Sequence, residues 1–104
     1  MKTHGDCFFP QVITDSEGKI VAAGTLFIER KFIRNCGAVG HVEDIVVDSA
    51  QRGKNLGRLL IQALTNVAKS HGCYKIILDC EPEKVQFYEK CGFTEKGRQM
   101  ALYF

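Results

Sequence analysis

Residues 44–60 read DIVVDSAQRGKNLGRLL, a stretch that begins with β-strand residues and ends with helix residues. Between the two lies a basic, glycine-containing loop with Arg52, Gly53, Lys54, Asn55 and Gly57. Arg58 follows directly, so three cations, Arg52, Lys54 and Arg58, fall within seven residues. A helix N-terminus has unpaired backbone N–H groups and a partial positive charge, and flexible residues let an anion approach those groups closely. The stretch therefore predicts a phosphate or pyrophosphate site. A solvated basic loop that caps the helix is the alternative interpretation.

The segment after this loop has the clearest periodicity in the chain. Apolar residues recur at steps of three and four, namely Leu56, Leu59, Leu60, Ala63, Leu64, Val67 and Ala68. This spacing predicts an amphipathic helix, whose other side carries Arg58, Gln62, Asn66 and Lys69. The pair His71-Gly72 ends the predicted helix, because glycine readily takes the left-handed conformation found at helix C-termini.

The segment before residue 44 is predicted to consist of strands. Residues 8–14 and 19–28 form a hairpin through turn residues 15–18, and Pro10 suggests an edge position because proline cannot donate to a ladder. Residues 39–47 return to strand character after a charged connection. Three strands therefore precede the long helix.

The segment after the long helix is predicted to form another βα unit and a final strand. Residues 74–80 are nearly continuously apolar and branched, as in a central strand. Pro82 suits the first turn of a second helix that Gly92 ends, and the remaining β residues are 93–94 and 99–104. The order β-β-β-α-β-α-β indicates an α+β fold with a mixed sheet flanked by helices, in a single domain of residues 1–104.

Composition excludes several classes of function. The 104 residues carry a net charge of +2 with dispersed basic residues, which argues against nucleic-acid binding. No apolar run reaches the roughly 20 residues that span a bilayer, so no membrane partner is expected. The five cysteines contain no C-x-x-C pair and the three histidines lie far apart, so neither disulfides nor a metal site is indicated. Reduced thiols and a cytoplasmic location are expected.

Several motifs together resemble a known enzyme family. QRGKNLGRLL (51–60) resembles the pyrophosphate loop R-x-x-G-x-G/A of the GNAT superfamily of acetyl-CoA-dependent N-acetyltransferases, with Asn55 in place of the middle glycine. The segments IERKFIRNCGAVGHVEDIVV (28–47), GCYKIILDC (72–80) and FYEKCGF (87–93) narrow the resemblance to the glucosamine-6-phosphate N-acetyltransferase family. This resemblance implies the GNAT-type acyl-CoA N-acyltransferase fold without its first strand and two helices, which the sequence lacks upstream of the hairpin.

The resemblance also implies a reaction and a binding site for its acetyl donor. Acetyl would pass from acetyl-CoA, as co-substrate and without a metal, to the amine of glucosamine 6-phosphate in the UDP-N-acetylglucosamine pathway. The implied cofactor-binding residues are Ile45, Val46, Val47, Arg52, Gly53, Lys54, Asn55, Leu56, Gly57, Arg58, Lys84, Val85 and Gln86. In the family the strand at 45–47 is splayed, so its backbone N–H groups face the cofactor. Lys84 stands where many members have Asn, which makes its side-chain contact doubtful.

The implied catalytic residues are Asp79, Tyr88 and Glu43. Tyr88 would donate a hydrogen bond to the departing thiolate, and without the resemblance a half-buried helix aromatic would be the favoured interpretation. Asp79 is preferred over Glu43 as the group that orients the amine and takes its proton. The implied substrate-binding residues are Lys31, Phe32, Ile33, Arg34, Glu43 and Asp44, of which the first four match the sugar-phosphate segment.

Two other functions and one assembly state are compatible with the same residues. The chain could acetylate another small or peptide amine, or it could be a non-catalytic acetyl-CoA-binding fragment that lacks the N-terminal elements. Members of the family are homodimers, which implies a homodimer here. The apolar residues 100–104 are expected either to join its interface or to form a plain terminal strand.

Overall fold

The computed structural model describes residues 8–30, 37–49 and 55–104. The elements run in the order β1 (Phe8–Thr14), β2 (Ile20–Arg30), β3 (Ala38–Val47), α1 (Leu56–Ser70), β4 (Cys73–Ile77), the 3₁₀ turn η3 (Pro82–Lys84) and α2 (Val85–Lys90). The hairpin, the long helix and the second βα unit are thus confirmed. The second helix opens as a 3₁₀ turn at Pro82 before it becomes α-helical.

The strands form one mixed sheet in the order β1-β2-β3-β4. β1 and β3 each pair with β2 antiparallel, whereas β3 and β4 pair parallel. Pro10 lies in β1 at the edge of this sheet, as predicted. The hairpin turn has Gly18 at φ 85°, and Asp15 Oδ1 accepts hydrogen bonds from the backbone N–H groups of Glu17 and Lys19.

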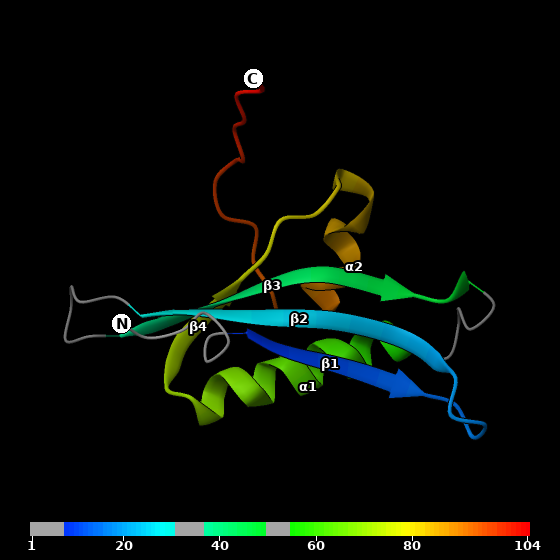
Figure 1. Ribbon diagram of the computed structural model, residues 1–104. Coiled ribbons are helices and arrows are strands. Elements are labelled where there is room, and N and C mark those ends of the chain that lie inside the picture. The colour runs from blue at the N-terminus through cyan, green and yellow to red at the C-terminus, as the bar shows by residue number, and fades with distance from the viewer. Residues whose placement is uncertain (1–7, 31–36, 50–54) are drawn as a thin grey trace.

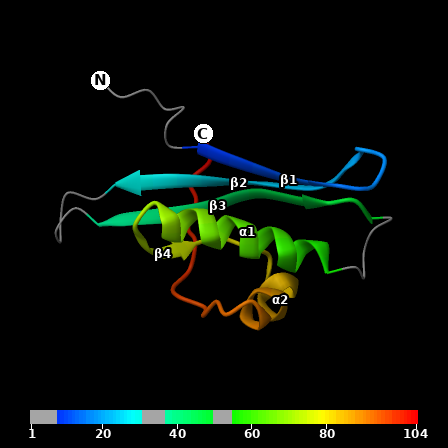
Figure 2. The same ribbon diagram turned by 90° about the horizontal axis from the view of Figure 1, so that it is seen from below.

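α1 lies along one face of the sheet, and α2 lies beside the start of α1 at the edge formed by β4 (Figures 1 and 2). The core between α1 and the sheet includes three fully buried leucines, Leu26, Leu60 and Leu64. The helix buries Leu60, Ile61, Leu64 and Ala68. Leu59, predicted on this face, is 50% exposed instead, because the buried stripe is centred one residue further along.

The predicted final strand is wrong. Residues 93–104 form neither helix nor strand, and the chain runs away from the sheet after α2 (Figure 1). The apolar side chains at this end are largely solvent-exposed, with Met100 at 92% and Leu102 at 80%. No other described segment pairs with the outer side of β4. β4 is therefore an edge strand of the described sheet, not the central strand that its apolar sequence predicted.

Candidate functional site

The parallel strands β3 and β4 separate part of the way along β3. Their pairing covers Ala38–His41 of β3 and Cys73–Ile77 of β4, whereas β3 continues to Val47. The rest of β3 pairs with β2 on one side and with no described strand on the other. The backbone of this half of β3 is therefore open toward the gap, which is the divergence that the resemblance implied. Ligand binding by Ile45, Val46 and Val47 stays a prediction.

A β-bulge sits in this open half of β3. Thr25 pairs with Glu43 and Ala23 pairs with Val46, so Asp44 and Ile45 together oppose Gly24. Asp44 has φ 60°, a left-handed backbone conformation that a non-glycine residue rarely adopts. An extra residue of this kind bends a strand and re-aims its side chains. The bulge therefore marks the point where β3 changes direction relative to its neighbours.

The bulge also exchanges the two faces of β3. Before it, the even-numbered Ala38 and Val42 belong to the core, whereas after it the odd-numbered Ile45 and Val47 pack against the core. Val46 is correspondingly 63% exposed. Gly24 makes room for this arrangement, since a Cβ atom added there would lie 2.5 Å from Ile45 Cδ1. The predicted cofactor strand is thus anchored to the core by its odd residues, which leaves its backbone free to serve a ligand.

The helix α1 begins at a residue in an unusual conformation. Asn55 is the N-cap, with φ 59° and ψ 25°, and its side chain makes no capping hydrogen bond. Asn55 thus has a left-handed backbone conformation, which asparagine tolerates better than most residues. The first intrahelical bond runs from Leu59 N–H to Asn55 O at 3.1 Å, and the first turn contains no acidic residue. Backbone N–H groups in the first turn of a helix have no partner within the helix and can bind an anion, and ligand binding by Asn55, Leu56 and Gly57 stays a prediction.

Arg58 lies on the exposed side of this first turn. It lines a cleft of about 210 Å³ together with Ile61, Gln62, Thr65, Lys90 and Cys91. The cleft lies between α1 and the end of α2, so two cations from different helices border it. This arrangement agrees with an anionic ligand near Arg58. The predicted ligand-binding residues Arg52, Gly53 and Lys54, like Lys31, Phe32, Ile33 and Arg34, lie outside the described residues.

Tyr88 is half-buried between two phenylalanines. Its ring lies edge-on to Phe87 at 4.9 Å and to Phe93 at 5.8 Å between centroids. Burial raises the pKa of the Tyr88 phenol, and the neighbouring thiols of Cys80 and Cys91 add to the rise. The phenol therefore keeps its proton at neutral pH and can act as a hydrogen-bond donor. No hydrogen bond joins its hydroxyl to another residue in the described ranges.

Asp79 follows the end of β4, and its side chain is exposed. The next residue, Cys80, lies close enough to Tyr88 to raise the pKa of its phenol further. Partial desolvation raises the pKa of the Cys80 thiol, and the carboxylates of Glu95, Asp79, Glu81 and Glu83 raise it further. Sequence analysis missed this thiol as a neighbour of Tyr88, because the two residues are close only through the turn between β4 and α2.

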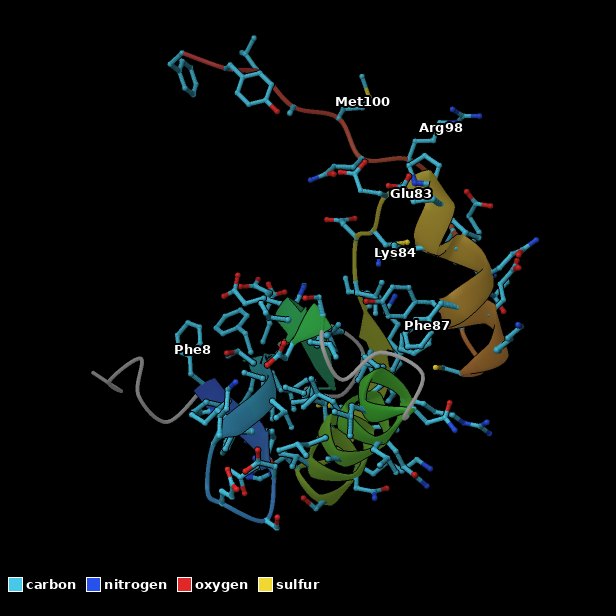
Figure 3. All side chains as sticks on the ribbon, turned by 90° about the vertical axis from the view of Figure 1, so that its right-hand side faces the viewer. Phe8, Glu83, Lys84, Phe87, Arg98 and Met100 are labelled. Carbon is cyan, nitrogen blue, oxygen red and sulfur yellow. The ribbon has the colours of Figure 1, made fainter. Side chains whose placement is uncertain are left out.

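The other predicted site residues lie at the bulge of β3 and at the junction of η3 and α2. Glu43 and Asp44 are both exposed and flank the start of the bulge, so both carboxylates are accessible. Lys84 and Gln86 are exposed and Val85 is half-buried where η3 becomes α2. Figure 3 shows Lys84, the last residue of η3, near the start of α2, the helix that carries Phe87. Within the described ranges, no three potential ligands gather as a metal site. No helix among these residues is long and apolar enough to cross a membrane.

Comparison with known proteins agrees with this geometry. Residues 2–93 match the acetyltransferase (GNAT) family. The chain is 59% identical over 88 residues to a probable glucosamine 6-phosphate N-acetyltransferase 2 of Oryza sativa subsp. japonica, which covers 85% of this chain and 53% of that protein. It is 53% identical to glucosamine 6-phosphate N-acetyltransferase 1 of Dictyostelium discoideum, covering 99% of this chain and 66% of that protein.

A solved structure gives the same result. The crystal structure of glucosamine-6-phosphate N-acetyltransferase from Arabidopsis thaliana superposes with a TM-score of 0.90 at 52% identity, covering 96% of this chain and 69% of that one. The chain thus spans roughly half to two thirds of the length of the relatives it matches. The chain belongs to the GNAT family of acetyltransferases, in the group whose named members are glucosamine 6-phosphate N-acetyltransferases.

Proposed function

We propose that this chain is an acetyl-CoA-dependent N-acetyltransferase domain that acetylates the amine of glucosamine 6-phosphate. The observation that carries the proposal is the identity of 52% with the Arabidopsis enzyme over 96% of the chain. The splay of β3 and β4 next to an open helix N-terminus supports it. The named relatives are longer than this chain, so the activity of this chain is proposed from the part that it shares with them.

The residues of the chain divide into holding and reacting groups. The start of α1, with Arg52, Gly53, Lys54, Asn55, Leu56, Gly57 and Arg58, would hold the diphosphate of coenzyme A. Ile45, Val46 and Val47 would line the pantetheine through their backbone, and Lys84, Val85 and Gln86 would contact it from α2. Asn55 supports this assignment, since its left-handed conformation opens the first turn of α1.

Acetyl-CoA supplies an acetyl group activated as a thioester, and the chain supplies proton transfer around it. The exposed carboxylate of Asp79 is the proposed acceptor of the amine proton, with Glu43 as the second candidate. Tyr88 is the proposed donor to the sulfur, because burial raises its pKa and keeps the phenol protonated. Lys31, Phe32, Ile33 and Arg34, with Glu43 and Asp44, would bind the sugar phosphate. Two cations in this set suit a phosphorylated sugar.

A thiol-release assay with acetyl-CoA tests the proposal. Turnover with glucosamine 6-phosphate, lost with glucosamine, supports it, because the unphosphorylated sugar lacks the group that Lys31 and Arg34 would bind. Turnover only with other amines would instead assign the chain to a different acceptor. Calorimetric binding of acetyl-CoA without turnover would make it a non-catalytic binding domain. Tyr88→Phe should lower kcat about 10²-fold or more while leaving acetyl-CoA affinity nearly unchanged.

We also propose that the chain is a cytoplasmic homodimer. Exposed apolar side chains on the sheet face opposite α1 support association, among them Phe8 at 41% and Val12 at 54% exposure. The apolar residues 100–104 add a second exposed surface. Sedimentation equilibrium of the 104-residue chain tests this assembly state. A mass that stays at the monomer value at high concentration would reject it. Fractionation of cells that express the chain tests the compartment.

A further inference from the structure

A single aromatic ring fills the space beside Gly57. A Cβ atom added at Gly57 would lie 3.1 Å from Phe87 Cζ, 3.6 Å from Cε1 and 3.9 Å from Cε2. All three atoms belong to one ring, which points from α2 toward the start of α1 in Figure 3. Gly57 does not have a positive φ, so the helix itself imposes no need for glycine at this position. The close approach of the Phe87 ring therefore offers a packing reason for glycine at this position.

This contact is one of those that hold the short helix α2 against the body of the protein. α2 has only six residues, none of them fully buried. A helix this short is not stable without tertiary packing. Phe87 is half-buried and packs against the core, so it connects α2 to the body of the protein. The fit between Phe87 and Gly57 therefore contributes to the placement of α2, together with the packing of Tyr88 and Cys91 on the core.

The same ring determines the surroundings of Tyr88. The Phe87 and Tyr88 rings meet at 4.9 Å with an interplanar angle of 77°, and Phe93 contacts Tyr88 from another side at 5.8 Å. Phe93 N–H also donates to Tyr88 O at 3.0 Å, which ties the end of α2 to the tyrosine backbone. A displacement of Phe87 would therefore change both the position and the burial of the Tyr88 phenol.

We infer that Phe87 is a positioning residue that docks α2 onto Gly57 and thereby holds Tyr88 in its working place. The role of Tyr88 in catalysis rests on the proposed function. The packing of Phe87 against Gly57 and Tyr88 is independent of that function. The competing explanation for Gly57 is that a side chain would obstruct the diphosphate. The two explanations differ in one respect: only the packing relation makes the effect of Gly57→Ala depend on the residue at position 87.

A double-mutant cycle separates these explanations. The variants are Gly57→Ala, Phe87→Leu and the pair, each measured for kcat and for the KM of acetyl-CoA. Each single change should lower kcat with a smaller change in KM. If the two changes acted independently, the kcat of the double variant relative to wild type would equal the product of the two single-variant ratios. We expect it to be at least about threefold higher than that product, because a smaller residue at position 87 accommodates the added methyl group. The inference would be overturned if the relative kcat of the double variant equalled the product of the two single-variant values. It would also be overturned if Gly57→Ala raised the KM of acetyl-CoA equally with Phe and with Leu at position 87.

A titration provides a readout that does not require activity. The ultraviolet absorbance of tyrosinate, with Tyr88→Phe as the reference, isolates the Tyr88 phenol from Tyr74 and Tyr103. Phe87→Leu should move its pKa toward the ordinary value, since the ring that buries it is reduced. Phe9→Leu is the matched control, because Phe9 packs on His71 at the opposite end of α1, at 4.4 Å. An unchanged Tyr88 titration in Phe87→Leu, or an equal shift in Phe9→Leu, would refute the positioning role even if no variant turns over.

Discussion

The backbone of Asp44 offers a direct test of how β3 forms the open side of the site. Asp44 has φ 60° in the bulge, and its side chain is exposed. A left-handed conformation costs an ordinary L-residue roughly 1–2 kcal/mol, less for Asp and Asn, and most for a β-branched residue. Asp44→Val should therefore destabilise the fold by about 1–2 kcal/mol, although it removes few contacts. For a domain of this size, each kcal/mol lowers Tm by roughly 4–8 °C.

Two matched substitutions separate conformation from charge. Asp44→Asn removes the carboxylate but tolerates the left-handed backbone, and Asp44→Gly removes the side chain and adopts that backbone freely. Both should keep Tm within a few degrees of the wild-type value. Thermal unfolding followed by circular dichroism gives the Tm, and calorimetry gives acetyl-CoA affinity, which we expect to fall only with Asp44→Val. If the Val and Asn variants unfold at the same temperature, backbone strain at the bulge is not what limits this position.

Three further outcomes follow from contacts near the site. Gly24→Ala should destabilise the fold by about 1–3 kcal/mol, measured by urea unfolding, because the added Cβ would lie 2.5 Å from Ile45 Cδ1. Adding Ile45→Val removes that Cδ1 atom and should recover part of the lost stability. Burial raises the pKa of Tyr88 in the folded state, so its contribution to stability is complete below the unfolded pKa of about 10 and is lost as pH rises through the folded value. Wild-type Tm should accordingly fall more steeply than that of Tyr88→Phe in alkaline buffers, and parallel curves would argue against this linkage. Burial also raises the pKa of the Cys91 thiol, and the nearby Arg58 partly lowers it. Iodoacetamide should therefore label Cys91 slowly at neutral pH, and more slowly still in Arg58→Gln. Faster labelling in that variant would contradict the influence of Arg58 on Cys91.

The parts of the fold that sequence predicts well are those that local chemistry determines. The long helix has a strong apolar period and a glycine just after its end, and the structure places it at Leu56–Ser70 with Gly72 at φ 81°. The hairpin turn has Asp and Gly in the positions where turns need them, and it forms as predicted. Asparagine tolerates the left-handed conformation better than most residues, and Asn55 has that conformation. In each case the signal lies within a few residues of the feature.

The final strand fails as a prediction because its formation depends on a neighbour. The segment QMALYF is apolar enough for a strand, but a strand is stable only when another strand accepts its hydrogen bonds. Here residues 99–104 lie apart from the outer side of β4, and both are left exposed, with Tyr103 at 90% and Tyr74 at 61%. The apolar run of β4 likewise predicts a central strand, but the described sheet has no strand on its outer side. Hydrophobicity indicates that a segment can be covered, and it does not identify what covers it.

The candidate site could be predicted only in outline, because it is built where regular structure is interrupted. Alternation along β3 predicts one continuous face, yet the bulge at Asp44 exchanges the faces and turns Ile45 inward. The parting of β3 and β4 after His41 was implied by the family resemblance alone, since no residue pattern within the two strands indicates it. A backbone can offer its N–H groups to a ligand only where no neighbouring strand uses them. The bulge and the parting of the strands, which regular pairing does not predict, are therefore the features that leave backbone donors of β3 available to a ligand.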